Sequence, residues 1–337
     1  MGDPVIDVHI HFGVPDDPAS GGFWSEEFAR SPAYYAMLLI TRSLFKRVDY
    51  GKIKEVMFAV LDDSKYTEKA VFLALDKVYD KDGNPHDEKT HLYVPNSCII
   101  RLAGENDKVL FGASVHPYRP DWEEELNSCL AKGAVLCKWI PSTQLINPEN
   151  DRCLPLYHKL ALHDLPLLCH CGPEYAIPTS DPIYAVYNNP KYLRTALDMG
   201  VTVIIAHCAT PYWGSLDVDY QDDFEEFLKL FREADAKGWK LYADLSAVCT
   251  PFRSPYIEKV IDAIPSSRLL YGSDYPIPIS DVCFKKSKKF LFWLSSLAKT
   301  LFMKNLLDKN YMLIKEMGFD DCVYSNAAKL FNAIRYT

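Results

Sequence analysis

The chain has 337 residues, of which 48% are hydrophobic and 24% are charged, and its formal net charge is −8. This composition excludes a largely disordered or fibrous chain. The acidic balance argues against nucleic acids and anionic membranes as partners, because general binding to them depends on basic surface. We therefore expect a small-molecule substrate, and a chain of this length forms either two ordinary domains or one large α/β barrel.

Short apolar runs rich in β-branched residues recur along the chain and predict eight strands. Most are nearly continuous in hydrophobicity, as expected for parallel strands buried on both faces, and segments with helical periodicity separate most of them. The predicted strands begin at Val5, Glu55, Leu110, Ala134, Pro166, Val201, Leu241 and Leu269. The alternation of strands and helices predicts one closed (β/α)8 TIM barrel, with residues 1–337 forming a single domain.

Three stretches depart from this repeat. An insertion after the first strand, about residues 13–52, is rich in aromatic residues and is expected to cover the mouth of the barrel as a lid. A second insertion, about residues 62–107, is rich in turns. The tail from about 284 to 337 is basic and apolar, and it predicts extra C-terminal helices on the barrel, since Phe290–Phe302 is too short and too polar to span a bilayer.

The N-terminal segment and the cysteine spacing indicate the cellular compartment and the state of the thiols. The first residues, MGDPVIDVHIHF, lack the basic and apolar segments of an export signal, so a cytoplasmic protein is expected. The ten cysteines form no CxxC pairs, which favours buried, reduced thiols over a disulfide framework or a zinc ribbon.

The strongest local signal is a pair of histidines on the first predicted strand. His9 and His11 are two residues apart, so both side chains project from the same face of the strand. Two neutral imidazoles in this arrangement can chelate zinc or a similar metal. On this pair alone, two hydrogen-bonded core histidines are an equally good interpretation.

Three later strands end in a polar residue that follows an apolar run. These residues are His170, His207 and Asp274. A polar group near a barrel core must be hydrogen-bonded, paired or coordinated. Because the C-terminal ends of the strands converge on one mouth of a TIM barrel, we expect these three side chains to meet the first two histidines in a metal site.

This set of residues resembles the signature of the amidohydrolase superfamily. The segments KWIPSTQLINPENDRC, AHCATPYWG, YGSDYPIP and SNAAKLFNAI are similar to its metal-dependent hydrolase branch, which includes amino-carboxymuconate-semialdehyde decarboxylase. The resemblance covers essentially the whole chain and is specific for superfamily and branch, but not for substrate. It implies that His9, His11, His170 and Asp274 bind the metal, while His207 binds a second metal or acts as an acid or base.

Lys138 decides between one and two ions. In the binuclear relatives that the chain resembles, a lysine at the end of strand four is carboxylated and bridges the two metals, and Lys138 occupies that position. A lysine among apolar neighbours has a lowered pKa, and the neutral amine is the form that captures carbon dioxide. The alternative is a lysine that pairs with Asp274 or with a substrate carboxylate. Zinc is the preferred ion, with iron or manganese acceptable to the same ligands.

Catalytic and substrate-binding roles are expected for a few further groups. Asp274 is placed to take a proton from metal-activated water, with His207 as the second catalytic candidate. His116, Glu174 and Arg253 follow strands and are candidates for substrate binding. Alternatively, His116 is a core histidine or supports a ligand, Glu174 is a solvated loop carboxylate, and Arg253 forms a surface ion pair.

Three reactions fit this site. The leading hypothesis is hydrolysis of a C–N or C–O bond in a small amide, lactone or ester. The second is non-oxidative decarboxylation of a small, aromatic-like carboxylate at one metal ion. The resemblance adds a third, oxygen activation at two iron or manganese ions, and it raises a homodimer or a paired complex with a related subunit as the assembly to test.

Overall fold

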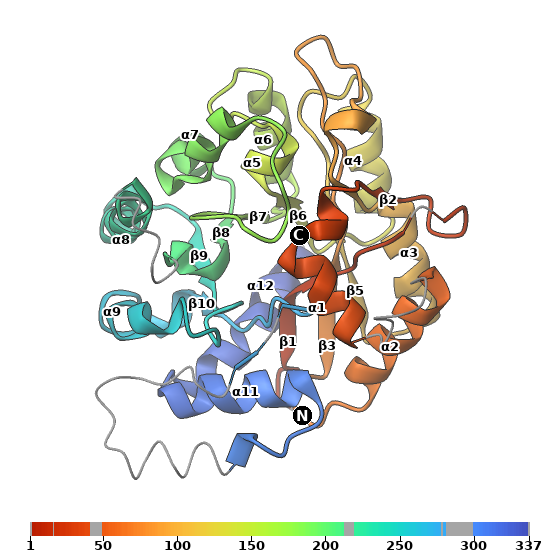
Figure 1. Ribbon diagram of the computed structural model, residues 1–337. Helices are drawn as coiled ribbons and strands as arrows, with labels where there is room; N and C mark the ends of the chain where they lie inside the picture. Colours follow the sequence, from red (N-terminus) through yellow and green to blue (C-terminus); the bar gives the residue numbers. More distant parts are fainter. Residues whose placement is uncertain are drawn as a thin grey trace.

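Eight parallel strands form one sheet that curves into a barrel (Figure 1). The structure is a computed structural model and describes residues 2–15, 17–40, 49–211, 219–277, 279–280 and 299–335. The barrel closes next to β1, where the backbone N of Val8 donates to the O of Tyr271 (3.0 Å) and that of His11 donates to the O of Tyr275 (2.9 Å). In sheet order the strands are β1 (Ile6–His11), β3 (Lys69–Leu73), β5 (Val109–Ala113), β6 (Leu136–Trp139), β7 (Leu167–Cys169), β8 (Val203–Ile205), β9 (Leu241–Asp244) and β10 (Leu269–Leu270). The predicted (β/α)8 TIM barrel is therefore confirmed.

Helices follow the strands and surround the barrel (Figure 1). The α-helices between strands are α2 (Tyr50–Asp62), α3 (Asn96–Glu105), α4 (Trp122–Ala131), α5 (Pro141–Gln144), α6 (Cys153–Leu162), α7 (Arg194–Asp198), α8 (Asp219–Lys237) and α9 (Ile257–Ala263). Short 3-10 helices complete the connections: η1 (Phe28–Arg30), η2 (Asp87–Lys89), η3 (Pro182–Asn188), η4 (Pro190–Leu193), η5 (Ala206–Ala209), η6 (Ser254–Tyr256), η7 (Ser266–Arg268) and η8 (Asp321–Tyr324).

The strand predicted from Glu55 is wrong, because this segment lies in α2. Its buried residues include Ile53, Met57 and Leu61, which recur every four residues as on one face of a helix. Asp49 caps the helix by accepting a hydrogen bond from the backbone N of Lys52 (2.8 Å). The second barrel strand is instead β3, which lies inside the stretch predicted to be the second insertion. That insertion is therefore shorter, and it runs from the end of β3 to the start of α3.

Apolar side chains fill the barrel interior. They include Ile6, Val8, Val71, Leu73, Leu110, Leu136, Leu168, Ile204 and Leu270. The C-terminal helix α12 (Asn326–Arg335) adds Ala327, Ala328 and Phe331 to this cluster and contacts β1 and β10. Lys138 lies two residues after Leu136, and His170 two residues after Leu168. Strand alternation therefore directs both polar side chains into the interior, at the C-terminal ends of the strands.

The insertion after β1 forms one wall above the barrel. Its strand β2 (Phe23–Trp24) pairs antiparallel with β4 (Leu92–Tyr93) of the second insertion, and α1 (Pro32–Ile40) follows. The ring of Trp24 lies 6.0 Å from that of Phe28 and 5.3 Å from that of Tyr34. The aromatic residues of this insertion thus pack mainly on one another, and Phe28 also faces the cavity described below.

The C-terminal part forms helices, as predicted. α11 (Leu306–Met317) precedes α12, whereas residues 281–298 of the predicted tail lie outside the described residues.

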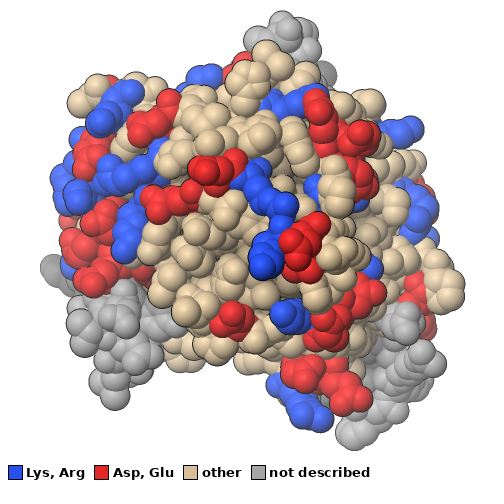
Figure 2. Space-filling view, turned by 90° about the horizontal axis from the view of Figure 1, so that it is seen from above, with Lys and Arg blue, Asp and Glu red and all other residues tan. Residues whose placement is uncertain are grey.

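No helix in the described ranges is both long and apolar enough to cross a membrane. The cysteines that the structure describes are free thiols. On the face shown in Figure 2, basic and acidic side chains lie interspersed.

Candidate metal centre

His9 and His11 enter the barrel interior at the end of β1. Val8 faces the interior, so strict alternation would direct His9 and His11 outward. The strand shifts register between Asp7 and Ile10, and after this shift both histidines face the interior. His9 is fully buried, and burial holds its pKa well below the ordinary value. Its imidazole is therefore neutral, the form that binds metals.

Three ligand atoms form a nearly regular triangle at this point. Nε2 of His9 lies 3.1 Å from Nε2 of His11, and Oδ1 of Asp274 lies 3.3 Å from the second atom and 3.5 Å from the first. Two ligands of a tetrahedral zinc ion lie about 3.3 Å apart. Three donors at this spacing match one face of a tetrahedral coordination shell. The residues present therefore fit a divalent metal ion.

A second group of metal-ligating types involves His9, His207 and Asp244. Here Asp244 is already joined by hydrogen bonds to the ring of His9 and to the backbone of His207. Nδ1 of His9 lies 2.8 Å from Oδ2 of Asp244, while Oδ1 of Asp244 accepts from the backbone N of His207 (2.8 Å) and of Ser246 (3.0 Å). We interpret this group as the support of the centre, because a carboxylate that holds the far nitrogen of a histidine orients its near nitrogen toward the metal.

Lys138 extends from β6 to the same point. Its Nζ lies 3.1 Å from Nε2 of His9, and the side chain is fully buried. Burial lowers the pKa of the amine, which favours its neutral form. The structure thus places the lysine beside the ligand triangle, as the sequence predicts.

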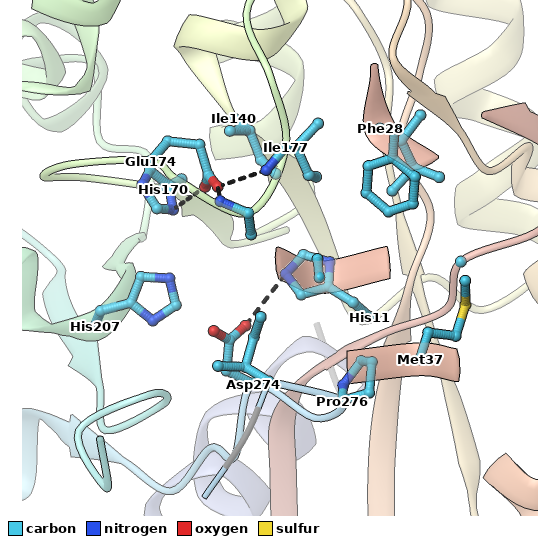
Figure 3. A pocket seen from close by; sticks show the side chains of 15 residues that line it. His11, Phe28, Met37, Ile140, His170, Glu174, Ile177, His207, Asp274 and Pro276 are labelled. Atoms are coloured by element: carbon cyan, nitrogen blue, oxygen red, sulfur yellow. Dashed lines mark hydrogen bonds and ion pairs between the residues drawn. The ribbon is translucent and has the colours of Figure 1, made fainter. Parts of the chain in front are cut away.

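His170 follows β7 and faces the centre from the opposite side (Figure 3). Its Nδ1 lies 3.3 Å from Oε2 of Glu174, whose Oε1 accepts from the backbone N of Ala176 (2.6 Å) and Ile177 (2.9 Å). Within the described parts of the chain, Nε2 of His170 is buried and has no hydrogen-bond partner. A buried, unpaired imidazole nitrogen at this place suits a metal ligand. Glu174, a candidate for substrate binding, contacts His170 and also lines the cavity described below.

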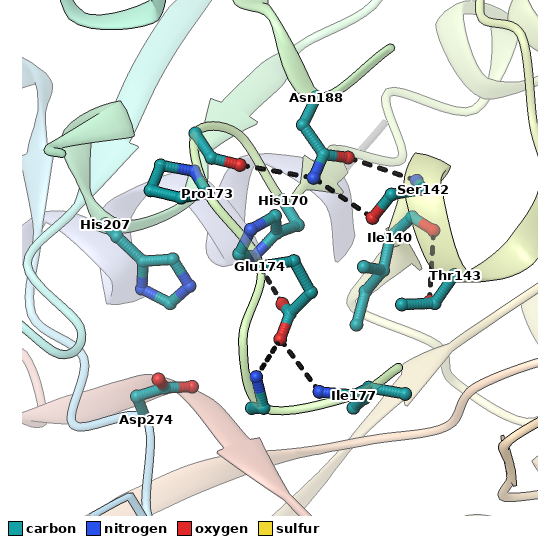
Figure 4. Close-up of polar contacts among 12 residues, drawn as sticks. Ile140, Ser142, Thr143, His170, Pro173, Glu174, Ile177, Asn188, His207 and Asp274 are labelled. Carbon is teal, nitrogen blue, oxygen red and sulfur yellow. Dashed lines mark hydrogen bonds and ion pairs between the residues drawn. The ribbon is translucent and has the colours of Figure 1, made fainter. Parts of the chain in front are cut away.

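The loop that carries Glu174 is held by Asn188 at the end of η3 (Figure 4). The amide nitrogen of Asn188 donates to Oγ of Ser142 (3.0 Å) and to the O of Gly172 (3.1 Å), and its oxygen accepts from the backbone N of Ser142 (3.1 Å). Because Asn188 is buried, these bonds fix the loop after β7 to α5.

His207 lies in an unusual backbone turn after β8. It and the next two residues all have positive φ angles, 55°, 50° and 45°, a region that non-glycine residues rarely adopt. Such conformations persist where surrounding contacts determine them, and they cluster at functional sites. Here the backbone N of His207 donates to Asp244, and Oγ1 of Thr210 donates to the O of His207 (2.8 Å).

The hydrogen bonds of His207 define where its proton lies. Its Nδ1 is 3.2 Å from the backbone O of Ser246, which can only accept, and 2.8 Å from Oγ of Ser246. Nδ1 therefore carries the hydrogen, and Nε2 keeps a lone pair. Burial holds the pKa of His207 well below its ordinary value. Its ring centroid lies 5.0 Å from that of His9 and 5.1 Å from that of His170.

A cavity that opens to solvent lies above these groups (Figure 3), and its empty space, open solvent included, is about 530 Å³. It is lined by His11, Gly13, Phe28, Ala33, Met37, Leu92, Ile140, His170, Glu174, Ala176, Ile177, His207, Asp274, Pro276 and Ile277. Two of the predicted substrate residues, His116 and Arg253, are not among them. Nε2 of His116 donates to the O of Gln144 (2.9 Å), and Arg253 donates to the backbone O of Thr210 and Pro173. Both side chains support loops.

Asp244 and Ser246 were not singled out in the sequence. Asp244 ends the apolar run LYAD, so it follows the same pattern as His170 and Asp274. Oγ of Ser246, two residues later, lies 3.0 Å from Nδ1 of His9 and 2.8 Å from that of His207. Asp244 could therefore have been selected by the rule that selected His170 and Asp274, although its partner His9 could not.

A TIM barrel with imidazole and carboxylate ligands at the C-terminal ends of its strands defines a metal-dependent barrel enzyme. The family model described as Amidohydrolase matches residues 6–282, and the chain therefore belongs to the amidohydrolase family. This confirms the resemblance seen in the sequence. No curated protein matches the chain.

Solved structures show the same fold. An uncharacterized TIM-barrel protein from Bordetella bronchiseptica is 15% identical, with 99% of this chain and 100% of that chain covered and a TM-score of 0.59. A probable 2-pyrone-4,6-dicarboxylic acid hydrolase from Acinetobacter baumannii, with citric acid bound, is 16% identical (98% and 100% covered, TM-score 0.56). A 2,6-dihydroxybenzoate decarboxylase in complex with 2,6-dihydroxybenzoate is 12% identical (98% and 99% covered, TM-score 0.58). At these identities the similarity shows the fold.

Proposed function

We propose that this protein is a metal-dependent hydrolase that acts on a C–N or C–O bond of a small amide, lactone or ester. The observation that carries the proposal is the pair of contacts from Nδ1 of His207 to Ser246, which assigns the ring proton to Nδ1. This histidine presents a lone pair, rather than a proton, to the cavity that is also lined by His11 and Asp274 of the ligand triangle. A base beside a metal site is the arrangement that activates water.

The protein groups divide the work as follows. His9, His11, His170 and Asp274 would hold a divalent ion, which would polarise the substrate carbonyl and acidify water. Asp274 and Nε2 of His207 can each accept the proton of the attacking water. That proton then passes to the leaving nitrogen or oxygen, so the base is restored after each turnover.

We propose zinc as the preferred ion, because imidazole nitrogens and one carboxylate at tetrahedral spacing suit it. Iron and manganese are chemically acceptable to the same donors. Carboxylation of Lys138 would add a bridging ligand and a second ion. Its complete burial and lowered pKa support that form.

Decarboxylation is the main rival, and two structurally similar proteins are decarboxylases. That reaction needs a proton donor for the carbon that loses CO2. His207 in its neutral form has its only proton directed at Ser246, away from the cavity. Hydrolysis, which needs an acceptor, therefore fits this site better.

The test combines metal analysis with two activity assays. The purified protein is analysed for metal per chain and assayed against small esters, lactones and amides, and separately for CO2 release from hydroxybenzoates. His207→Gln should retain the metal and lose hydrolysis by about 100-fold, the order that a general base contributes. His158→Gln, an exposed histidine on α6, is the matched control. CO2 release without hydrolysis would overturn the proposal, and oxygen consumption by an iron- or manganese-loaded protein would replace it with oxygen activation.

Lys138→Ala distinguishes one ion from two. Two metals per chain that fall to one or none in this variant would establish the bridged site. One metal that is unaffected by the substitution would assign Lys138 to a hydrogen-bonding role beside His9.

A further inference from the structure

The two ends of the cavity differ in chemistry (Figure 3). His207, His170 and Asp274 lie at one end, around the candidate metal centre. Phe28 and Met37 lie at the other end. The apolar lining consists of Phe28, Ala33, Met37, Leu92, Ile140, Ala176, Ile177, Pro276 and Ile277. A ligand that fills this space must therefore be polar at one end and apolar at the other.

Among the described lining residues, none is a lysine or arginine, and the two carboxylates are Glu174 and Asp274. Two buried cations on neighbouring segments have other contacts. Nζ of Lys138 contacts Nε2 of His9, and the guanidinium of Arg253 donates to the backbone O of Thr210 and Pro173. A substrate carboxylate in the apolar end would thus be buried without a counter-charge, at a large cost in free energy.

The apolar wall is built from five separate segments, so its composition does not come from one local sequence bias. Phe28 and Met37 come from the insertion after β1, Leu92 from the second insertion, and Ile177 from the loop after β7. Phe28, Met37 and Ile177 are 3%, 3% and 6% exposed. Such buried side chains present a fixed apolar surface to a ligand.

We propose that the substrate is a small, uncharged molecule whose aromatic or branched aliphatic group packs between Phe28, Met37 and Ile177. Its scissile carbonyl lies at His11 and Asp274. This inference rests on the proposed hydrolase function and adds the substrate class. It excludes di- and polycarboxylates as preferred substrates. Phe28, Met37 and Ile177 are then the residues that determine specificity.

Binding and turnover are measured with matched pairs on the zinc-loaded protein. Each pair differs only in one carboxylate: benzamide and 4-carboxybenzamide for binding by calorimetry, methyl benzoate and monomethyl terephthalate for hydrolysis. The neutral member should bind at least about 10-fold more tightly and show the higher kcat/KM, because the anionic member leaves its carboxylate unpaired.

Ile177→Lys should reverse this preference by adding a cation to the apolar end. Ile183→Lys, 69% exposed on η3 nearby, is the control and should leave the preference unchanged. Should Ile177→Lys fail to fold, Ile177→Ala should weaken binding of benzamide while zinc content stays the same. Preference of the wild-type protein for the anionic members, or no binding of either neutral compound, would overturn the inference. Binding of the neutral compounds without any hydrolysis would instead refute the hydrolase proposal and leave the ligand class standing.

Discussion

Oδ2 of Asp244 lies 2.8 Å from Nδ1 of His9, and both side chains are completely buried. An ionised carboxylate can only accept a hydrogen bond, so this contact holds the proton of His9 on Nδ1. Nε2 of His9 then keeps its lone pair, and it faces His11 and Asp274. Asp244 is therefore placed as a positioning residue that would select which nitrogen of His9 binds an ion.

Asp244→Asn should weaken zinc binding by about 10- to 100-fold, the usual effect of removing a carboxylate that supports a metal-bound histidine. The amide can donate to Nδ1, which shifts the proton of His9 to Nε2 and removes the lone pair. Zinc affinity is measured by competition with a chromogenic chelator, and circular dichroism checks the fold. Asp262→Asn, exposed on α9, is the control. Unchanged zinc affinity in Asp244→Asn would remove Asp244 from this role.

Ser246→Ala should affect turnover more than metal binding. Oγ of Ser246 is 2.8 Å from Nδ1 of His207, and its loss leaves that nitrogen with only the backbone O at 3.2 Å. His9 keeps its contact with Asp244, so zinc content should stay as in the wild type. We expect kcat to fall by about 10-fold, the lower end for such supporting contacts. Parallel loss of zinc and activity would mean that Ser246 acts through His9 instead.

The proximity of the candidate ligands could be predicted because the barrel brings the ends of its strands together. His170 and Asp274 each follow an apolar run, and a polar residue there has few alternatives to coordination or pairing. His116 and Arg253 follow strands in the same way, yet the structure directs them to backbone carbonyls of neighbouring loops. A local pattern does not specify which partner a side chain meets when that partner lies in another loop.

Two other features required the three-dimensional structure. Asp244 meets His9 across 235 residues of sequence, so its role is set by the barrel, which brings the ends of β9 and β1 together, rather than by its own segment. The segment from Glu55 has the composition of a strand, whereas the repeat of Ile53, Met57 and Leu61 has the period of a helix. The period is the better guide, because it decides which side chains one face can bury.

His91 connects two walls of the cavity and provides a third prediction. Oγ of Ser180 donates to the O of Lys89 (2.7 Å), so it accepts from Nε2 of His91 (2.9 Å), and Nδ1 of His91 accepts from Oγ of Ser25 (2.9 Å). The insertion after β1 and the loop after β7 are thereby tied together.

His91→Phe keeps a planar ring at this position and removes both hydrogen bonds. We expect the Kd for benzamide to rise several-fold, since each net hydrogen bond contributes about 1 kcal/mol and the walls it orders would loosen. Zinc content should not change, because His91 does not contact the centre. Calorimetry measures the Kd, and His158→Phe on the surface of α6 is the control. Loss of zinc together with benzamide binding would contradict a role confined to the cavity walls.

His116 makes a prediction about stability against pH. Burial lowers its pKa to about 3 from the ordinary value of 6.5. Between these values the unfolded chain binds a proton at this residue and the folded chain does not. The free energy of unfolding therefore falls as the pH drops from about 6.5 toward 3, by up to about 1.4 kcal/mol per pH unit from this group. Above pH 6.5 both states are neutral here, and the contribution is constant.

His116→Gln should remove that dependence. The glutamine amide can still donate to the O of Gln144, so the variant can retain the main contact of His116. Urea unfolding at pH 7.5, 6.5 and 5.5 should show a slope in the variant that is shallower by up to one proton between the two lower values. The other buried histidines titrate in both proteins, so the difference between the slopes isolates His116. His163→Gln, exposed after α6, should keep the wild-type slope. Parallel slopes for wild type and His116→Gln would mean that His116 is protonated in the folded protein, and that its ring does not keep the hydrogen bond from the backbone N of Tyr118 to Nδ1 (3.1 Å).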